Sequence, residues 1–199
     1  DFSGHITDKV HPKIVEASKR LLLIYASLTL AEVILLLAGK MPLFDAVCHS
    51  MSTLSTGGFS TRNQGMAAFS SPFIKAVVAI FMFVAGTNMS LFYFALKKNY
   101  SKILHNKEFR FYALLTTTFS IIFVLILFLI PGKPFLKALS DGFFHVISLI
   151  STTGFYTDNF AEWGDLAVAG ILFLMFIGAM SGSAGGGIKI VRFMILWHN

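Results

Sequence analysis

The chain has 199 residues, of which 55% are hydrophobic and only 13% are charged. A soluble domain is typically about a quarter charged, so this composition excludes an ordinary soluble globular protein. The net charge of +6 does not indicate a nucleic-acid-binding protein, because the basic residues lie between apolar segments rather than in one patch. With a single cysteine, Cys48, the chain has no internal disulfide framework.

Three segments are apolar and long enough to cross a hydrocarbon core of ~30 Å, which takes ~20 residues of helix. In chain order they are Leu21 to Ala38, Phe73 to Leu96 and Phe111 to Ile130. A shorter segment, Leu43 to Leu54, follows the first of them and would form a helix of only ~18 Å. A second short segment, from about Phe135 to Ile150, follows the third. The sequence therefore predicts an all-α integral membrane protein whose short helices are re-entrant.

The last apolar stretch is interrupted by the run GAMSGSAGGGIK at residues 178–189. A phosphate-binding loop needs a lysine directly after glycine and a serine or threonine next, whereas Gly187 is followed by Ile-Lys-Ile. The preceding residues, Leu166 to Met180, give only ~22 Å of helix. The apolar pattern resumes at Ile188 and continues to Trp197. We therefore predict a membrane helix that unwinds between about Gly178 and Gly187, with a simple kink as the alternative.

The basic residues are distributed unevenly about these segments. Of the 16 Lys and Arg residues, eleven fall on one side: Lys9, Lys13, Lys19, Arg20, Lys97, Lys98, Lys102, Lys107, Arg110, Lys189 and Arg192. The positive-inside rule assigns this side to the cytoplasm. The start of the chain and residues 97–110 are therefore predicted to be cytoplasmic, and no nucleic-acid partner is predicted.

A pattern of eight residues occurs twice, 96 residues apart. It reads D-x-x-x-H-x-x-S-x-x-S-T-x-G-F-x-T and begins at Asp45 and at Asp141. Each copy follows a full span, covers a short helix with the loop after it, and leads into another apolar segment. The predicted architecture is span, re-entrant helix, loop and span, occurring twice.

Each copy contains a glycine-bearing loop directly after the re-entrant helix. The candidate residues are Thr56, Gly57, Gly58 and Phe59 in one loop and Thr152, Thr153, Gly154 and Phe155 in the other. Irregular backbone at membrane depth is tolerated only where it is buried in protein or lines a water-filled cavity. The C-terminal end of a helix carries partial negative charge, and carbonyls beyond it can replace the hydration shell of a monovalent cation. Gly58 and Gly154 readily take the positive φ angles that such a loop requires. We predict cation binding by the main chain, with ordinary hairpin turns as the alternative.

These stretches resemble a known family. MSTLSTGGFST and ISTTGFYTD look like the filter regions of the bacterial Trk/Ktr/HKT potassium transporter superfamily, which is built from four span–pore–span repeats. GAMSGSAGGGIKIVR is similar to the interruption in that family's third repeat, although Ala184 lacks the hydroxyl usual at its position. The resemblance covers essentially the whole chain and is greatest to the TrkH/TrkG type of membrane subunit.

The resemblance implies potassium uptake across the bacterial inner (plasma) membrane by a multi-pass protein that is not an enzyme and has no cofactor. It implies that K⁺ is coordinated by the carbonyls of the two loops. It implies a gate formed by Gly178, Ser181, Gly182, Ser183, Ala184, Gly185, Gly186 and Gly187. The partners implied are the lipid bilayer, a second copy in a homodimer and a cytosolic TrkA-like ring of nucleotide-binding regulatory subunits.

The resemblance also divides the chain. Residues 1–12 are expected to be a cytoplasmic stretch, 13–98 the second repeat, 99–107 a cytoplasmic linker and 108–199 the third repeat with a broken last helix. Because two of the expected four repeats are present, the chain is expected to be a fragment of a longer one, or else two copies assemble. Channel-like conduction and symport with protons or sodium both stay open. The alternative functions are the potassium-binding subunit of an ATP-driven pump of the same superfamily and a non-conducting structural protein.

Other polar residues carry weaker predictions. Glu32 lies in the middle of the first span, where a carboxylate is a functional candidate or bonds to a neighbouring helix. His49 and His145 occupy equivalent positions in the re-entrant helices and are expected to pack or to form hydrogen bonds rather than to bind a metal. Asn88, with Gly86, interrupts the second span and either lines an inner vestibule or bonds between helices.

Overall fold

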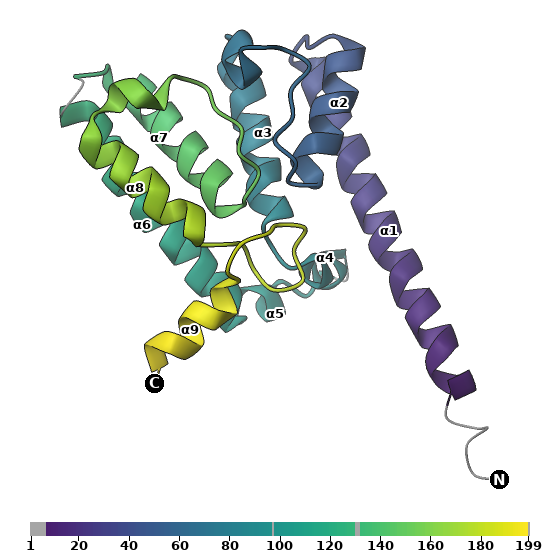
Figure 1. Ribbon diagram of the computed structural model, residues 1–199. Coiled ribbons are helices and arrows are strands. Elements are labelled where there is room, and N and C mark those ends of the chain that lie inside the picture. Colours follow the sequence, from purple (N-terminus) through teal and green to yellow (C-terminus); the bar gives the residue numbers. More distant parts are fainter. Residues whose placement is uncertain (1–6, 97, 130–131, 199) are drawn as a thin grey trace.

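The computed structural model describes residues 7–96, 98–129 and 132–198, and within these ranges every regular element is a helix (Figure 1). In chain order the α-helices are α1 (Thr7–Ala38), α2 (Leu43–Leu54), α3 (Pro72–Ala85), α4 (Met89–Leu96), α5 (Tyr100–Leu104), α6 (Lys107–Leu129), α7 (Phe135–Ile150), α8 (Asp165–Phe176) and α9 (Ile190–His198). Two short 3-10 helices, η1 (Gly65–Ala68) and η2 (Phe160–Trp163), follow α2 and α7.

Two helices of the described part are long and apolar enough to cross a membrane. They are the Ser18–Ala38 part of α1 and the whole of α6, Lys107–Leu129. Large apolar side chains on these helices face outward, and Leu22 and Leu114 are 68% and 66% exposed. Such outward-facing leucines suit a hydrocarbon environment, since water disfavours extended apolar surface.

The two short helices begin and end as the sequence predicts. Pro42 and Pro134 precede α2 and α7, and proline suits this position because it lacks the amide hydrogen that a helix start leaves unpaired. Ser55 and Ser151 close the helices in equivalent conformations. In Figure 1 both helices occupy the upper half of the molecule, α2 against α1 and α7 against α6 and α3.

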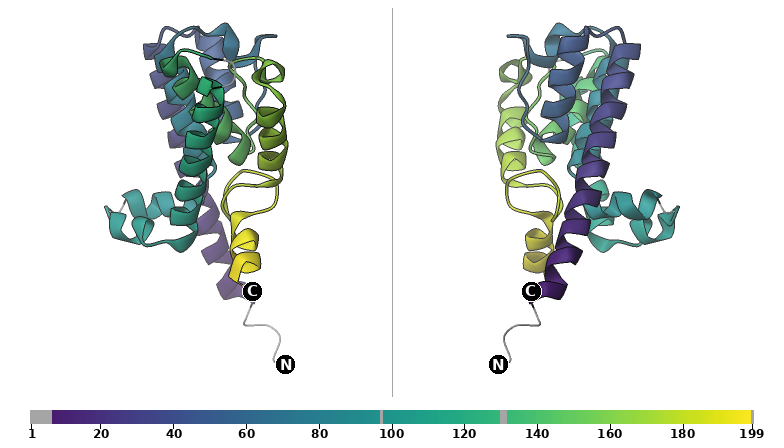
Figure 2. Two further views of the ribbon diagram at one scale, coloured as in Figure 1. Left: turned by 90° about the vertical axis from the view of Figure 1, so that its left-hand side faces the viewer. Right: turned by 90° about the vertical axis from the view of Figure 1, so that its right-hand side faces the viewer.

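The predicted span from Phe73 to Leu96 is interrupted at Gly86 and Asn88, the two residues that indicated an interruption in the sequence. The helix ends at Ala85 and restarts at Met89, and the side-chain oxygen of Asn88 caps the new start by accepting a 2.8 Å hydrogen bond from the Ser90 amide. After the break, α4 and α5 form an elbow that projects sideways from the lower part of the molecule (Figure 2). The expected linker 99–107 therefore contains the helix α5.

The break predicted in the last apolar stretch is present. Helix α8 ends at Phe176, slightly earlier than expected, and α9 begins at Ile190. The residues between them, 177–189, form an irregular segment that we call the glycine-rich loop, the yellow loop in the centre of Figure 1. The two ends of the loop are held together by an isolated β-bridge between Ile177 and Ile188.

Each half of the chain has its own buried apolar cluster. One gathers side chains of α1, α2 and α3, including Leu36, Leu54 and Met82, and the other gathers side chains of α6, α7 and α8. The first cluster also takes in Phe144 and Phe155 from the second half. The two halves are therefore joined where the second re-entrant helix and its loop pack against the first half.

Candidate functional site

The loops that follow α2 and α7 share one backbone conformation. We call residues 55–61 the first loop and residues 151–157 the second loop. In both, the threonine after the closing serine has a positive φ, 53° at Thr56 and 59° at Thr152, and so does the glycine two positions later, 69° at Gly58 and 87° at Gly154. A left-handed threonine costs about 1–2 kcal/mol, so its appearance in both loops shows that the surrounding contacts impose the conformation.

A carboxylate in each short helix, Asp45 in the first turn of α2 and Asp141 in the middle of α7, bonds to the far end of the loop that follows. The Thr61 hydroxyl donates to Asp45 at 2.6 Å, and the Thr157 hydroxyl donates to Asp141 at 3.0 Å. These are the first and last residues of the repeated pattern. The end of each loop is therefore hydrogen-bonded to the helix that precedes the loop.

The histidines of the pattern reinforce this closure. Each Nδ1 bonds to the carbonyl oxygen four residues earlier, at 2.7 Å for His49 and 2.9 Å for His145. On the other ring nitrogen, His49 bonds to the Ser60 hydroxyl at 2.9 Å and His145 accepts from the Thr157 amide at 3.3 Å. Because the Thr157 amide can only donate, Nδ1 of His145 carries the proton and the ring is neutral. The expectation of hydrogen bonding for both histidines is confirmed.

The middle serines of the pattern also hold the loops. Ser52 accepts a 2.7 Å hydrogen bond from the Phe59 amide, and Ser148 donates a 2.7 Å bond to the Phe155 carbonyl. With the aspartate and histidine bonds, these contacts attach each loop to its helix, and the amides of Gly57 and Thr153 also donate to the main-chain carbonyls of Ser52 and Ser148.

The two loops meet main chain to main chain. A Cβ atom placed on Gly58 would lie 2.0 Å from the Thr153 carbonyl oxygen, so only glycine fits there. Phe155 is 2% exposed and packs against the His49 ring at 5.9 Å, and the Tyr156 hydroxyl donates to the Asn63 carbonyl at 3.2 Å. The corresponding Phe59 is 80% exposed. Contacts from the second loop to the first thus fix their relative position.

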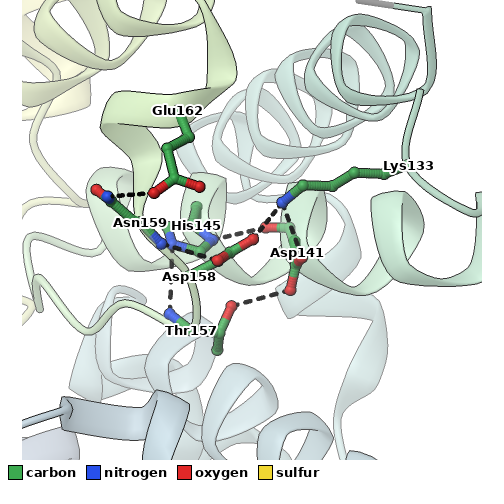
Figure 3. Close-up of polar contacts among 7 residues, drawn as sticks. All are labelled: Lys133, Asp141, His145, Thr157, Asp158, Asn159 and Glu162. Carbon is green, nitrogen blue, oxygen red and sulfur yellow. Dashed lines mark hydrogen bonds and ion pairs between the residues drawn. The ribbon is translucent and has the colours of Figure 1, made fainter. Parts of the chain in front are cut away.

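Both carboxylates are paired with a cation. Asp45 binds Arg62 at 2.6 Å, and Asp141 lies 3.5 Å from Lys133. Lys133 also bonds to Asp158 (Figure 3). Its ammonium group lies over the Trp163 ring, 4.8 Å from the ring centroid. These pairs neutralise the carboxylates, so they are not free anionic ligands.

The Lys133 cluster affects the titration of Asp158. Partial burial alone raises the pKa of this carboxyl, but hydrogen bonds from Lys133 and from the Asn159 amide outweigh burial and hold the pKa below its ordinary value. A carboxyl with a lowered pKa stabilises the folded state above its unfolded pKa of about 4 and loses this contribution as the pH falls further.

We expect Lys133→Met to destabilise the protein by roughly 2–4 kcal/mol, because two carboxylates then lose a shared, largely buried cation. The measurement is the thermal unfolding temperature in detergent from pH 8 to pH 3. The difference from the parent should narrow as the pH falls below about 4, because Asp158 is protonated first in the unfolded state and then, at its lowered pKa, in the folded parent. Lys137→Met, at an exposed position of α7, is the control. Equal losses in the two variants, or a difference independent of pH, would contradict the assignment.

The glycine-rich loop lies against the start of the second loop, at Ser151 and Thr152. The Gly186 amide donates to the Thr152 hydroxyl at 2.7 Å, and a Cβ atom on Gly185 would lie 2.9 Å from the Ser151 carbonyl oxygen. The predicted gate residues and the predicted residues of the second loop are therefore in direct contact. A preceding strand, which a nucleotide-binding loop requires, is absent from the described part of the chain.

The same loop also contacts the break between α3 and α4. The Met180 amide donates to the Gly86 carbonyl at 3.1 Å, and the Met89 amide donates to the Gly182 carbonyl at 3.2 Å. The Asn88 side chain packs against Gly182 and caps α4, so its hydrogen bond is made within its own segment rather than between helices. The two interrupted helices thus meet at their interruptions.

Glu32 is fully buried in α1, and neither of its carboxyl oxygens has a hydrogen-bond partner among the described residues. The hydroxyl of the neighbouring Thr53 donates to the His49 carbonyl instead. Of the two alternatives for Glu32, a hydrogen bond to a neighbouring helix is not seen among the described residues, and a functional role stays a prediction.

Within the described ranges, no group of three or more His, Cys, Asp or Glu side chains is placed to hold a metal ion. The ligands available at the two loops are neutral main-chain carbonyls, with the negative ends of α2 and α7 behind them. Such a site suits a weakly bound monovalent cation better than a transition metal, which prefers nitrogen, sulfur or carboxylate donors.

Several residues of the site were not predicted from the sequence. The sequence identifies Asp45 and Asp141 as the first residue of each copy of the pattern but predicts no role for them. Their presence in both copies could have indicated a structural or functional role. Lys133 and Arg62 occupy different places relative to the pattern, so the repeat gives no indication of them. Glu108, which bonds to Ser181 at a separation of 73 residues, has no signal in the linear sequence.

The fold is that of a membrane protein in which every described element is a helix, and comparisons with known proteins agree. The profile of the TrkH family, described as a cation transport protein, matches residues 3–199. The Trk system potassium uptake proteins TrkH of Salmonella typhimurium and Escherichia coli K12 are 38% and 36% identical over 99% of this chain and 41% of their own length. The crystal structure of the potassium transporter TrkH from Vibrio parahaemolyticus matches with a TM-score of 0.90 at 32% identity, covering 94% of this chain and 41% of that one.

The chain therefore belongs to the TrkH family of cation transport proteins. This confirms the resemblance seen in the loops and in the glycine-rich run. The family is one of transporters rather than of enzymes. The chain spans about two fifths of the length of the relatives that it matches.

Proposed function

We propose that the chain forms part of a potassium uptake protein and that its first and second loops contribute to the selectivity filter for K⁺. One observation carries this proposal: two loops of the same conformation, each at the C-terminal end of a short helix, meet main chain to main chain at Gly58 and Thr153. Because side chains and loop amides hold the loops against their helices, the carbonyls of Gly58 and Gly154, which accept no hydrogen bond from the described residues, can face a cation. The names of the relatives, potassium uptake proteins, support K⁺ as that cation.

We further propose that the glycine-rich loop is the gate. It lies across the start of the second loop, where Gly186 contacts Thr152. Its side chains are small, and Gly182 and Gly187 have positive φ angles that other residues rarely adopt. A segment of this kind can change conformation without displacing bulky side chains.

The proposed architecture has four span–pore–span units, of which residues 13–98 and 108–199 are the second and third. The length of the relatives supports it, as does Phe59, whose 80% exposure contrasts with the burial of Phe155 and leaves a surface for another unit. In this proposal residues 1–12 and 97–110 lie in the cytoplasm of a bacterium and the protein is a homodimer in the inner membrane. A TrkA-like nucleotide-binding ring is the proposed regulator.

The test is uptake of radiolabelled Rb⁺ into liposomes that contain the full-length protein. We expect uptake without ATP, strong competition by external K⁺ and weak competition by Na⁺. Uptake that requires ATP and a partner ATPase would instead support the pump subunit, and no uptake by correctly inserted protein would support a structural role. A dependence on a proton or sodium gradient would identify symport.

A further inference from the structure

We propose that Glu108 is the positioning residue of the glycine-rich loop, an anchor that keeps the loop against Thr152. Its carboxylate accepts two hydrogen bonds from one residue of the loop, from the Ser181 amide at 2.5 Å and from the Ser181 hydroxyl at 2.8 Å. Hydrogen bonds to a charged acceptor are about twice as strong as neutral ones. The inference rests on the proposed gate, but the anchor itself can be tested separately.

The other contacts of the loop are weaker. They are single neutral hydrogen bonds to Gly86, from Met89 and to Thr152, and much of the loop is exposed. From Ser181 onward the loop contains little apolar surface that could pack, since residues 181–187 are all Gly, Ser or Ala; Met180, just before them, is buried. A charged anchor from outside the loop therefore has a large effect on where the loop lies.

The cationic side chain of the loop, Lys189, bonds to other residues of the same loop. Lys189 donates to the Ser183 hydroxyl at 3.2 Å and to the Gly185 carbonyl, which braces the loop internally. Its charge also interacts favourably with Glu108. Removal of Glu108 therefore leaves the brace intact but frees the loop as a unit.

Glu108 is well placed to transmit movement. It lies in the first turn of α6, which Asn106 caps by accepting a 3.0 Å hydrogen bond from the Phe109 amide. The elbow of α4 and α5 leads directly into this turn (Figure 2). A displacement of the elbow that moves the start of α6 also moves the anchor, and with it the loop.

The experiment measures loop accessibility and ion flux in the full-length protein. Cys48 is replaced by alanine, and Ala184→Cys, at an exposed loop position, serves as a reporter for a charged, water-soluble thiol reagent applied from the loop's side. We expect Glu108→Ala to raise the labelling rate at least about tenfold, because two charge-assisted hydrogen bonds are lost. Rb⁺ uptake should also rise, with the K⁺ preference unchanged.

Three further variants complete the test. Glu108→Gln keeps an acceptor oxygen without the charge and should give an intermediate rate, which a merely structural role would not produce. Glu16→Ala removes an exposed carboxylate that bonds within α1 and should change nothing. If Glu108→Ala fails to insert, Ser181→Ala removes one of the two bonds and should raise labelling less.

The outcomes separate the anchor from the gate. Faster labelling with faster uptake supports both proposals. Faster labelling with unchanged uptake supports the anchor and counts against the loop as a gate. A labelling rate like that of Glu16→Ala in every Glu108 and Ser181 variant overturns the inference.

Discussion

Deletion of Ser181 to Ala184 is expected to raise potassium flux several-fold and to leave the preference for K⁺ over Na⁺ unchanged. The deletion removes the anchored part of the glycine-rich loop, including Ser181 and the Gly182 contact with Met89. The shortened segment can no longer lie across Thr152. The first and second loops, which would set selectivity, are untouched. The measurement is Rb⁺ uptake into liposomes at equal protein incorporation.

A matched variant separates the backbone of the loop from its side chains. Replacing Ser181, Ser183 and Ala184 by glycine, beside the existing Gly182, preserves the chain length and the main-chain amide of residue 181, so the increase in flux should be smaller. A correctly inserted deletion that conducts no more than the parent would show that the loop is only a structural break in the helix. Loss of selectivity in the deletion would place the glycine-rich loop in the filter itself.

Much of the fold follows from local sequence properties. The short helices α2 and α7 could be predicted because their apolar runs are too short to span and each follows a proline. The long helices α1 and α6 follow from uninterrupted hydropathy. The repeated sequence pattern corresponds to hydrogen bonds of its aspartate and histidine that are formed in both halves of the chain.

Gly86 and Asn88 indicated where the second span is interrupted, but the length of the break could not be derived in the same way. The sequence is apolar on both sides of these two residues, which are individually tolerated in helices. The break is stabilised by tertiary contacts, since the Gly86 carbonyl accepts from the Met180 amide and the Met89 amide donates to Gly182. Those partners lie more than 90 residues away in the chain, beyond the reach of local patterns.

In the candidate site, too, some features could be predicted from local sequence and others depend on tertiary contacts. Positive φ angles at Gly58 and Gly154 were expected from residue type, whereas those at Thr56 and Thr152 go against it. The threonines adopt this conformation because the rest of each loop is fixed to its helix. Likewise the anchor at Glu108 depends on the way that α6 and the glycine-rich loop pack, which only the three-dimensional structure reveals.

Gly58→Ser is expected to reduce the preference for K⁺ over Na⁺ towards unity. Two effects combine at this position: a positive φ of 69° that serine adopts only with strain, and a Cβ atom that would lie 2.0 Å from the Thr153 carbonyl oxygen. Either the first loop or the second must shift, and carbonyls that coordinate a cation would move with it. Gly57→Ser is the control, because the equivalent position in the second loop already carries the side chain of Thr153.

The central claim is that these two loops select the ion, and the K⁺/Na⁺ permeability ratio of Gly58→Ser against Gly57→Ser in reconstituted membranes tests it most directly. The account predicts a ratio near unity for Gly58→Ser and a ratio close to the parent's for Gly57→Ser. A Gly58→Ser protein that inserts, conducts and keeps the parent's ratio would contradict it.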